Sequence, residues 1–341
     1  MSSREVSVVI PTFNRSRTLL RVLRALEAQT VGPQAFEVFV VDDGSQDGTP
    51  SAVEQFAAQA SLELRYIRQQ NSGPAAARNR GIAASKGALV VFLGDDTIPA
   101  PEFLEEHLRY HGKHADNQKL AVVGYTAWLP GMVITPFMRY IGEAGPQFAY
   151  RWMQTDVPLP FLCFYSSNVS VPRALLEAVE YPFDEDFTDA MWEDTELGYR
   201  LAKQGMQLHF HPAAVAYHDH PTNLAQFCRR ASRVGAVSRL MIRKHPELAK
   251  SLFGHALLRR LSRAIAMPLV PVADFIDRRL RLPLPDLFYR AIVAVHYAEG
   301  AASAATRKAA MFLPATDQGT ASSPSRDKHV PSMMAAGRGI S

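Results

Sequence analysis

Two pairs of adjacent aspartates stand directly after apolar, β-branched segments. Asp42 and Asp43 follow FEVFVV, and Asp95 and Asp96 follow ALVVFL after a single glycine. Neighbouring carboxylates at the mouth of an apolar strand repel each other, and a bound cation offsets that cost. Hard oxygen ligands of this kind suit Mg²⁺ or Mn²⁺. A solvated acidic turn, which in the first case leads into a capped helix, is the simpler alternative.

A third polar segment, NSGPAAARNRG, combines a turn, a helix start and two arginines. The arginines are Arg78 and Arg80, and the helix start contributes free backbone amides. Both features place positive charge near phosphates. The segment is neither a Walker loop nor a GxGxxG fingerprint, so alone it identifies no ligand.

Four histidines alternate over a short stretch near the end of the first two thirds of the chain: His209, His211, His218 and His220. The repeated HxH spacing is compatible with zinc. However, alternate residues of any strand share a face, and no cysteine joins the four. We therefore do not expect a dedicated zinc site.

These polar residues follow an alternation of strands and helices. Strands are predicted at 6–10, 36–41, 62–67 and 88–93, with helices between them at 17–30, 49–60 and 75–85. This order implies right-handed crossovers and a mostly parallel sheet that helices cover on both faces. Ligands bind beyond the carboxyl ends of such strands. Each strand here is followed by a polar cluster, namely PTFNR, DDGSQDGT, NSGPAAARN or GDDT.

The pattern is less regular in the second half of the chain. A strand at 120–128 precedes an irregular stretch through Pro160 that is rich in proline, glycine and aromatic residues. The later predicted elements are a strand at 165–171, a helix at 192–204 and strands near 207–211 and 214–218. From 224 to 291 the chain looks helical, basic and amphipathic. From about residue 306 its Ala/Ser/Gly-rich composition predicts a flexible tail.

Composition excludes several classes of protein. The 341 residues are 47 % hydrophobic and 21 % charged, which is ordinary for a globular chain with its own core. Two cysteines cannot form a disulfide framework, and no uncharged apolar run is long enough to span a bilayer. The polar start of the chain predicts no signal peptide. We therefore expect a cytoplasmic protein, and exclude a secreted disulfide scaffold, a multispan membrane protein, a fibre and a mostly disordered chain.

Charge is distributed unevenly along the chain. Residues 1–222 carry 18 Lys and Arg against 26 Asp and Glu, whereas residues 223–300 carry 14 against 5. Basic amphipathic helices are typical of peripheral attachment to a membrane surface. Packing on the catalytic half, on a second copy of the chain or on a protein partner are the alternatives. We expect no nucleic acid partner, because no nucleic-acid-binding motif accompanies the charge.

Taken together, the polar clusters resemble a known family. The sequence is similar to the family 2 glycosyltransferases in the order and spacing of PTFNR, VVDDGSQDGT, NSGPAAARNRG, FLGDD, YSSNVSV and WEDTELGYRL. The resemblance implies a GT-A fold over residues 1–222, with a nucleotide-sugar-binding half (about 1–98) and an acceptor half (99–222). A helical basic C-terminal region (223–305) and the tail (306–341) would follow.

The resemblance also assigns roles to the donor site. The turn Pro11, Thr12, Phe13 and Asn14 would line the nucleoside pocket, Asp43 would accept a hydrogen bond from uracil, and Asp42 would support the turn. Arg78 would lie near the uridine diphosphate, Asp95 would face ribose or metal, and Asp96 would bind Mn²⁺ or Mg²⁺. The usual Asp-x-Asp metal motif has Gly94 at its first position here, so one expected ligand is missing.

The acceptor side resembles the family through an ED pair and a later histidine. Asp194 would be the general base that deprotonates the acceptor hydroxyl, Glu193 would position the acceptor, and His218 would be a metal ligand. The implied reaction is inverting transfer from a nucleotide-sugar donor, with UDP-sugars expected, to a carbohydrate or lipid-linked acceptor in polysaccharide or glycolipid synthesis. A non-catalytic nucleotide-sugar-binding protein and a nucleotidyltransferase remain alternatives, and a homo-oligomer is an open expectation.

Overall fold

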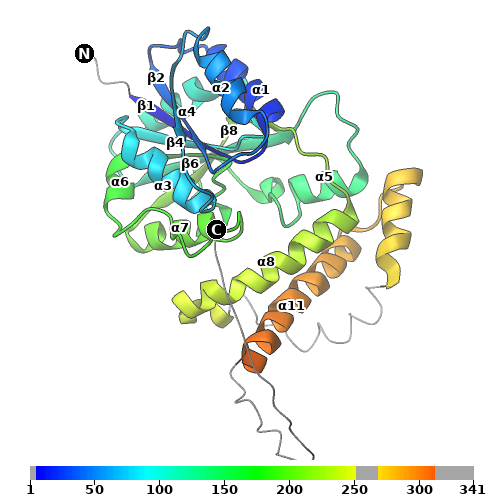
Figure 1. Cartoon of the computed structure of the whole chain (residues 1–341). Coiled ribbons are helices and arrows are strands. Elements are labelled where there is room, and N and C mark those ends of the chain that lie inside the picture. Colours follow the sequence, from blue (N-terminus) through cyan, green and yellow to red (C-terminus); the bar gives the residue numbers. More distant parts are fainter. Residues whose placement is uncertain (1–4, 251–267, 312–341) are drawn as a thin grey trace, which may run out of the picture.

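The computed structural model describes residues 5–250 and 268–311, in which one eight-stranded sheet lies between helices (Figure 1). The strands are β1 (Val6–Thr12), β2 (Phe36–Asp42), β3 (Glu63–Arg68), β4 (Leu89–Leu93), β5 (Thr97–Pro99), β6 (Leu120–Trp128), β7 (Asn168–Pro172) and β8 (Gln207–His218). Their order across the sheet is β3-β2-β1-β4-β7-β6-β8-β5. Strands β3, β2, β1 and β4 are parallel, β7 is antiparallel to both of its neighbours, β8 is parallel to β6, and β5 is antiparallel to β8.

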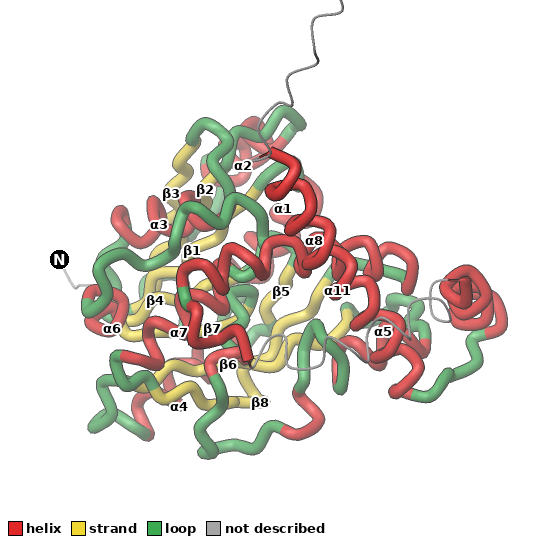
Figure 2. The backbone as a smooth tube through the Cα atoms, turned by 90° about the horizontal axis from the view of Figure 1, so that it is seen from below, coloured by secondary structure: helices red, strands yellow, loops and turns green. Residues whose placement is uncertain are grey.

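Helices cover both faces of the sheet (Figure 2). They are α1 (Ser16–Glu27), α2 (Thr49–Ala57), α3 (Pro74–Ala84), α4 (Phe103–Lys113), α5 (Pro136–Glu143), α6 (Arg173–Glu177), α7 (Glu193–Lys203), α8 (Leu224–Lys244) and α11 (Asp286–Met311). Short turns of helix lie at Tyr150–Trp152, Phe161–Cys163, Pro246–Leu248 and Ile276–Leu280. The predicted α/β class with a helical C-terminal extension is confirmed.

Alternation along β1 explains the two layers. Val8 and Ile10 pack with apolar residues of α1, α2 and α4, whereas Val9 packs on the other face with α3, α6 and α7. Successive strand residues point to opposite faces, so an unbroken apolar run is what a strand buried on both sides requires.

Two helices lie where the sequence pattern predicted none. Helix α5 occupies part of the stretch predicted to be irregular, and Thr135 accepts a hydrogen bond from the backbone amide of Met138 at its start. Helix α4 follows β5 in a stretch for which no element was predicted. Because α5 is only eight residues long, it depends on burial of its apolar face rather than on helix propensity.

The two strands predicted near 207–211 and 214–218 form one strand. Strand β8 pairs with β6 along its whole length, and a register shift between Gly124 and Tyr125 absorbs the irregular middle. A bulge of this kind bends a strand without ending it.

The C-terminal helices α8 and α11 lie side by side and share a third core with α5 (Figure 1). Each helix contributes an aromatic side chain to this core: Phe137 from α5, Phe227 from α8 and Tyr289 from α11. Helix α11 continues to Met311, so it occupies the first six positions of the predicted tail, and the remainder (312–341) lies outside the described residues. Part of the basic stretch (251–267) also lies outside them. Within the described ranges, no helix has the length and apolar character needed to cross a bilayer.

Candidate active site

The carboxyl ends of β1, β2 and β4 meet at one edge of the sheet and bring the predicted polar turns together. Thr12 at the end of β1 donates a hydrogen bond from its hydroxyl to Asp95 Oδ2 (2.9 Å), and its carbonyl accepts one from the amide of Asp43 (2.9 Å). Residues from three separate turns therefore contact one another directly, as expected where parallel strands end.

The turn between β1 and α1 is locked to the turn after β2. Asn14 has a left-handed backbone (φ 54°). Its side-chain oxygen accepts a hydrogen bond from the amide of Gln46 (2.7 Å), and its own amide donates to Ser45 Oγ (2.8 Å). Asn tolerates this backbone region better than most residues. Phe13 beside it is 43 % exposed, so its ring is available for contact with a ligand, whereas Pro11 and Thr12 belong to the strand.

Asp42 and Asp43 hold different parts of the site. Asp42 is fully buried and accepts hydrogen bonds from the amide of Ser45 and the hydroxyl of Tyr66. Asp43 accepts from the amides of Ser72 (2.8 Å) and Gly73 (2.9 Å) at the start of α3. Both carboxylates thus brace turns, and a carboxylate has lone pairs left for a further donor. The contact of Asp43 with a base stays a prediction.

Asp96 is the centre of a cluster that can hold a cation. His218 Nε2 lies 3.6 Å and His220 Nδ1 3.4 Å from Asp96 Oδ2. Ligand atoms of these three side chains all lie within 4.8 Å of one another, the single such His/Cys/Asp/Glu group found in the described chain. Carboxylate and imidazole donors suit a first-row divalent ion such as Mn²⁺. Asp96 and His218 were predicted from the sequence, whereas His220 was not, although the HxH spacing contained the signal.

Neighbouring side chains orient His218. Its ring stacks on Trp128 at 5.5 Å between centroids, and Gln147 Nε2 lies 3.3 Å from its Nδ1. Contacts to the second ring nitrogen fix which nitrogen faces a metal. His218 therefore presents Nε2 to Asp96.

Arg15 also reaches this cluster. Its guanidinium is hydrogen-bonded to Asp96 and lies 3.7 Å from Asp95 Oδ1. Burial and then the charge of Asp96 raise the pKa of Asp95 to about 7. Burial opposes ionisation of Asp96 as well, yet His218, His220 and Arg15 hold its pKa well below the usual range.

The departure at Gly94 has a local explanation. A Cβ at this position would lie 2.7 Å from Thr97 Oγ1 and 3.2 Å from Asp96 Oδ1. A larger residue would require Thr97 to move. Gly94 offers no side-chain donor here, and the oxygen and nitrogen atoms that could hold a cation are those of Asp96 and the two histidines.

The predicted ED pair starts α7. Asp194 Oδ1 accepts from the amide of Thr195 (2.7 Å), and its Oδ2 lies 3.4 Å from the amide nitrogen of Ser166. The next residue, Ser167, accepts a hydrogen bond from the amide of Gly94 (3.2 Å). These two contacts connect Asp194 to the end of β4, which Asp95 and Asp96 follow after Gly94.

Glu193 is buried and paired with Arg78. Arg78 Nη1 lies 3.0 Å from Glu193 Oε1, both side chains are buried, and the second oxygen of Glu193 has no hydrogen-bond partner. Burial, followed by the charge of Asp194, raises the pKa of Glu193, and the charge and hydrogen bond of Arg78 oppose this rise. The sequence resemblance placed Arg78 near a diphosphate, but its guanidinium is turned to Glu193 and to the ring of Phe183.

The two histidines of the first HxH pair, His209 and His211, lie outside the cluster. His209 hydrogen-bonds with the hydroxyl of Tyr110, and His211 with Glu106. They belong to the packing between β8 and α4, so the four histidines do not converge on one point.

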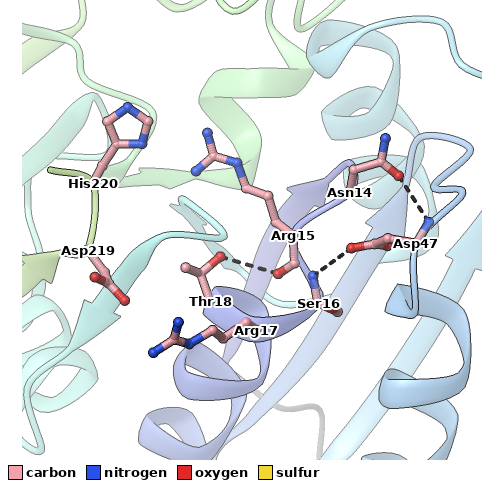
Figure 3. Close-up of a pocket in the computed structure, with 8 residues that line it drawn as sticks. All are labelled: Asn14, Arg15, Ser16, Arg17, Thr18, Asp47, Asp219 and His220. Atoms are coloured by element: carbon pink, nitrogen blue, oxygen red, sulfur yellow. Dashed lines mark hydrogen bonds between the residues drawn. The ribbon is translucent and has the colours of Figure 1, made fainter. Parts of the chain in front are cut away.

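A cavity of about 330 Å³ opens beside the cluster (Figure 3). It is lined by Asn14, Arg15, Ser16, Arg17, Thr18, Asp47, Asp219 and His220. Figure 3 shows that Arg15 and His220 come from opposite sides of this space, one from the start of α1 and the other from beyond β8.

Comparison with known proteins gives matches along most of the chain. The model of "Glycosyl transferase family 2" matches residues 7–142, and that of "Glycosyl transferase family group 2" matches 89–304, across the predicted boundary at 222. A validoxylamine A glucosyltransferase from Streptomyces hygroscopicus subsp. limoneus is 32 % identical over 73 % of this chain. Chondroitin synthase from Escherichia coli is 27 % identical over 71 % of it. The chain spans 58 % of the length of the first protein and 38 % of the second.

Solved structures show the same fold. The mannosyltransferase PcManGT from Pyrobaculum calidifontis, solved with GDP-Man and Mn²⁺, matches with a TM-score of 0.56 at 22 % identity, over 89 % of this chain and 87 % of that one. Residues 1–349 of TarS from S. aureus, solved with UDP, match with a TM-score of 0.52 at 18 % identity, over 89 % and 92 %. The predicted GT-A architecture is confirmed.

Proposed function

Because this chain belongs to glycosyltransferase family 2, we propose that it transfers a sugar from a nucleotide diphosphate donor to an acceptor hydroxyl, with inversion at the anomeric carbon. The observation that supports this most is the link from Asp194 through Ser166 and Ser167 to Gly94. It sets a candidate base beside the turn that carries Asp95 and Asp96. A UDP-sugar is the proposed donor, because Asp43 stands where the family's uracil-contacting carboxylate is expected.

The residues present fit a divalent ion. Asp96, His218 and His220 would hold Mn²⁺ or Mg²⁺, which when bound neutralises charge on a diphosphate leaving group. Asp194 accepts the proton of the acceptor hydroxyl as it attacks, and its hydrogen bond from Thr195 holds the carboxylate in place. Phe13 offers an exposed ring to the nucleoside. One displacement completes the transfer, and no covalent intermediate on the protein is needed.

The assignment of the base is tested with Asp194→Asn. We expect turnover to fall by about 100-fold or more, as for loss of a general base, while stabilisation by UDP with Mn²⁺ is unchanged. Asp116→Asn, an exposed acidic residue after α4, is the matched control and retains activity. Full turnover by Asp194→Asn with intact nucleotide binding would contradict the assignment.

The donor is tested by thermal stabilisation with UDP, GDP, ADP and dTDP, each with Mn²⁺ and with EDTA. A ligand that binds the native state raises the melting temperature by mass action. We expect the largest Mn²⁺-dependent shift with UDP. A larger shift with GDP or dTDP would overturn the UDP assignment and leave glycosyl transfer in place.

Two alternatives are not favoured. A non-catalytic binding protein does not need Asp194 beside the cation cluster. A nucleotidyltransferase would need a glycine-rich, basic loop after the first strand to grip a triphosphate, and the sequence there is PTFNR. Release of pyrophosphate from a nucleoside triphosphate and a sugar phosphate would favour the nucleotidyltransferase.

We also propose peripheral attachment to an anionic membrane, which would suit a lipid-linked or polysaccharide acceptor at its cytoplasmic face. The apolar side of α8 packs against α5 and α11. The exposed apolar surface of the C-terminal region lies instead between residues 268 and 287. Five large apolar side chains there are 52–75 % exposed, namely Val272, Phe275, Leu280, Leu282 and Leu287. Arg278, Arg279 and Arg281 are exposed among them. Apolar side chains flanked by arginines suit a lipid interface.

Vesicle sedimentation tests this attachment. We expect binding to vesicles containing phosphatidylglycerol and little binding to pure phosphatidylcholine, because each basic residue near an anionic surface adds attraction. Phe275→Ser with Leu282→Ser should weaken it, whereas Arg17→Gln with Arg24→Gln on α1 should not. The proposal would be overturned if all variants sedimented equally with the vesicles, or if the wild-type protein sedimented with neither kind of vesicle.

The proposed cytoplasmic location is supported by two buried, free cysteines, Cys163 and Cys228. The homo-oligomer stays a prediction.

A further inference from the structure

We propose that the guanidinium of Arg15 forms an ion pair with the Asp96 carboxylate until a divalent ion displaces it. Arg15 thereby makes the affinity for the metal ion depend on the bound nucleotide. This inference rests on the metal site of the proposed function. It assigns a positioning role to an arginine that the sequence resemblance left without one.

The contacts converge on a single atom. Arg15 Nη1 is hydrogen-bonded to Asp96 Oδ2, and both His218 Nε2 and His220 Nδ1 lie within 3.6 Å of the same oxygen. Arg15 Nη1 is also 3.7 Å from Asp95 Oδ1. The guanidinium nitrogen therefore lies beside both carboxylates, where the positive charge of a bound ion would stand.

A guanidinium and a divalent ion cannot share this oxygen without strong repulsion. Charge-assisted hydrogen bonds to carboxylates are short and strong, and like charges at such distances repel most where water is scarce. Asp95 and Asp96 are largely buried, with side chains 14 % exposed. Binding of a metal ion at Asp96 thus requires Arg15 to leave, and the lost ion pair lowers the affinity for the metal.

Arg15 has space into which it can move. Its backbone is fixed at the start of α1, because its carbonyl accepts hydrogen bonds from Leu19 N and Thr18 Oγ1. Its side chain is 37 % exposed and lines the cavity of about 330 Å³ (Figure 3). A rotation of the side chain alone can release Asp96 while α1 stays in place.

The nucleotide enters this exchange through its charge. A displaced guanidinium lacks an anionic partner, and a diphosphate bound at the cluster would supply one. Metal ion and nucleotide should then strengthen each other's binding by the same factor, since coupling between two ligands is reciprocal. Without Arg15 that coupling should be weaker.

Titration with Mn²⁺ alone, followed by electron paramagnetic resonance of the free ion, tests the proposal. We expect Arg15→Met to bind Mn²⁺ about tenfold more tightly than the wild-type chain, because no ion pair has to be broken. Arg17→Met is the matched control, since Arg17 lines the same cavity, and its affinity should match the wild type. Adding Asp96→Asn to Arg15→Met should remove the gain.

A second measurement uses UDP. We expect UDP to tighten Mn²⁺ binding more in the wild type than in Arg15→Met. Arg15→Gln repeats the test should the methionine variant be unstable. Unchanged or weaker Mn²⁺ binding by Arg15→Met, with the wild type still binding Mn²⁺, would overturn this inference alone. Absence of Mn²⁺ binding in every variant, with UDP still bound, would overturn it together with the proposed metal site.

Discussion

Arg78 and Glu193 come from the third helix and the seventh, yet they form a buried ion pair beside the candidate base. Arg78 Nη1 lies 3.0 Å from Glu193 Oε1. The carboxylate is adjacent in sequence to Asp194, so its position determines how α7 begins. A charge buried without its partner is far more costly than one that is paired.

Arg78→Met should therefore lower the free energy of unfolding by about 3–5 kcal/mol. The double variant Arg78→Met with Glu193→Gln should recover much of this loss, because no unpaired charge remains. Urea unfolding at pH 7.5 measures both. Arg80→Met, two residues along and exposed, should change stability little, and a loss as large as that of Arg78→Met would show that the pair is not the cause.

At the scale of elements, α8 and α11 approach each other through glycines. A Cβ at Gly235 would lie 1.9 Å from the carbonyl oxygen of Tyr297, and one at Gly300 would lie 1.6 Å from that of Ser232. The two helices can pack this closely only because both positions lack a side chain. Helix α8 in turn accepts a hydrogen bond at the carbonyl of Val234 from the indole of Trp192, which precedes α7. The packed pair α8 and α11 thus contacts the residue that precedes the helix carrying Asp194.

Gly235→Ala should destabilise the protein by about 1–3 kcal/mol through overpacking, although alanine favours helix formation. Differential scanning calorimetry should show a lower melting temperature. Gly112→Ala in α4 is the control, because a Cβ there meets nothing within 4 Å, and it should raise stability by up to about 1 kcal/mol. Equal gains for both substitutions would contradict the close approach of α8 and α11.

At the scale of the whole molecule, buried His107 and its partly buried neighbour His111 should make stability depend on pH. His107 contacts Asn168 Oδ1 (3.1 Å) and Ser170 Oγ (2.9 Å), and His111 contacts the same hydroxyl (2.8 Å). Burial, with a contribution from His111 and His211, lowers the pKa of His107 to about 3. Burial and the charge of His114 lower that of His111 to about 4.

The free energy of unfolding should fall as pH drops below 6.5. His107 in the unfolded chain binds a proton near that pH, whereas the folded protein keeps it neutral, so acid favours the unfolded state. The loss from His107 alone should reach about 2 kcal/mol at pH 5. Urea midpoints between pH 7.5 and 5 measure it. His107→Gln should show a shallower decline, and an unchanged slope would exclude His107 as the source.

Local sequence determined most strands, most helices and the polar turns that follow the strands. Five predicted strands became β1, β2, β3, β4 and β6 almost as predicted, because strand and helix periodicity are short-range properties. The parallel alternation also placed Thr12, Asp43 and Asp95 at one edge of the sheet. The family resemblance found Asp96 and His218 through motifs that need no three-dimensional knowledge.

Only the tertiary structure decided which of these groups meet. His220 joins Asp96, Arg15 contacts that same carboxylate, Arg78 pairs with Glu193, and α5 forms within the stretch predicted to be irregular. Each depends on contacts between residues far apart in the chain. No local pattern encodes such contacts, because their free energy comes from burial and charge pairing that exist only once the sheet and its helices have assembled.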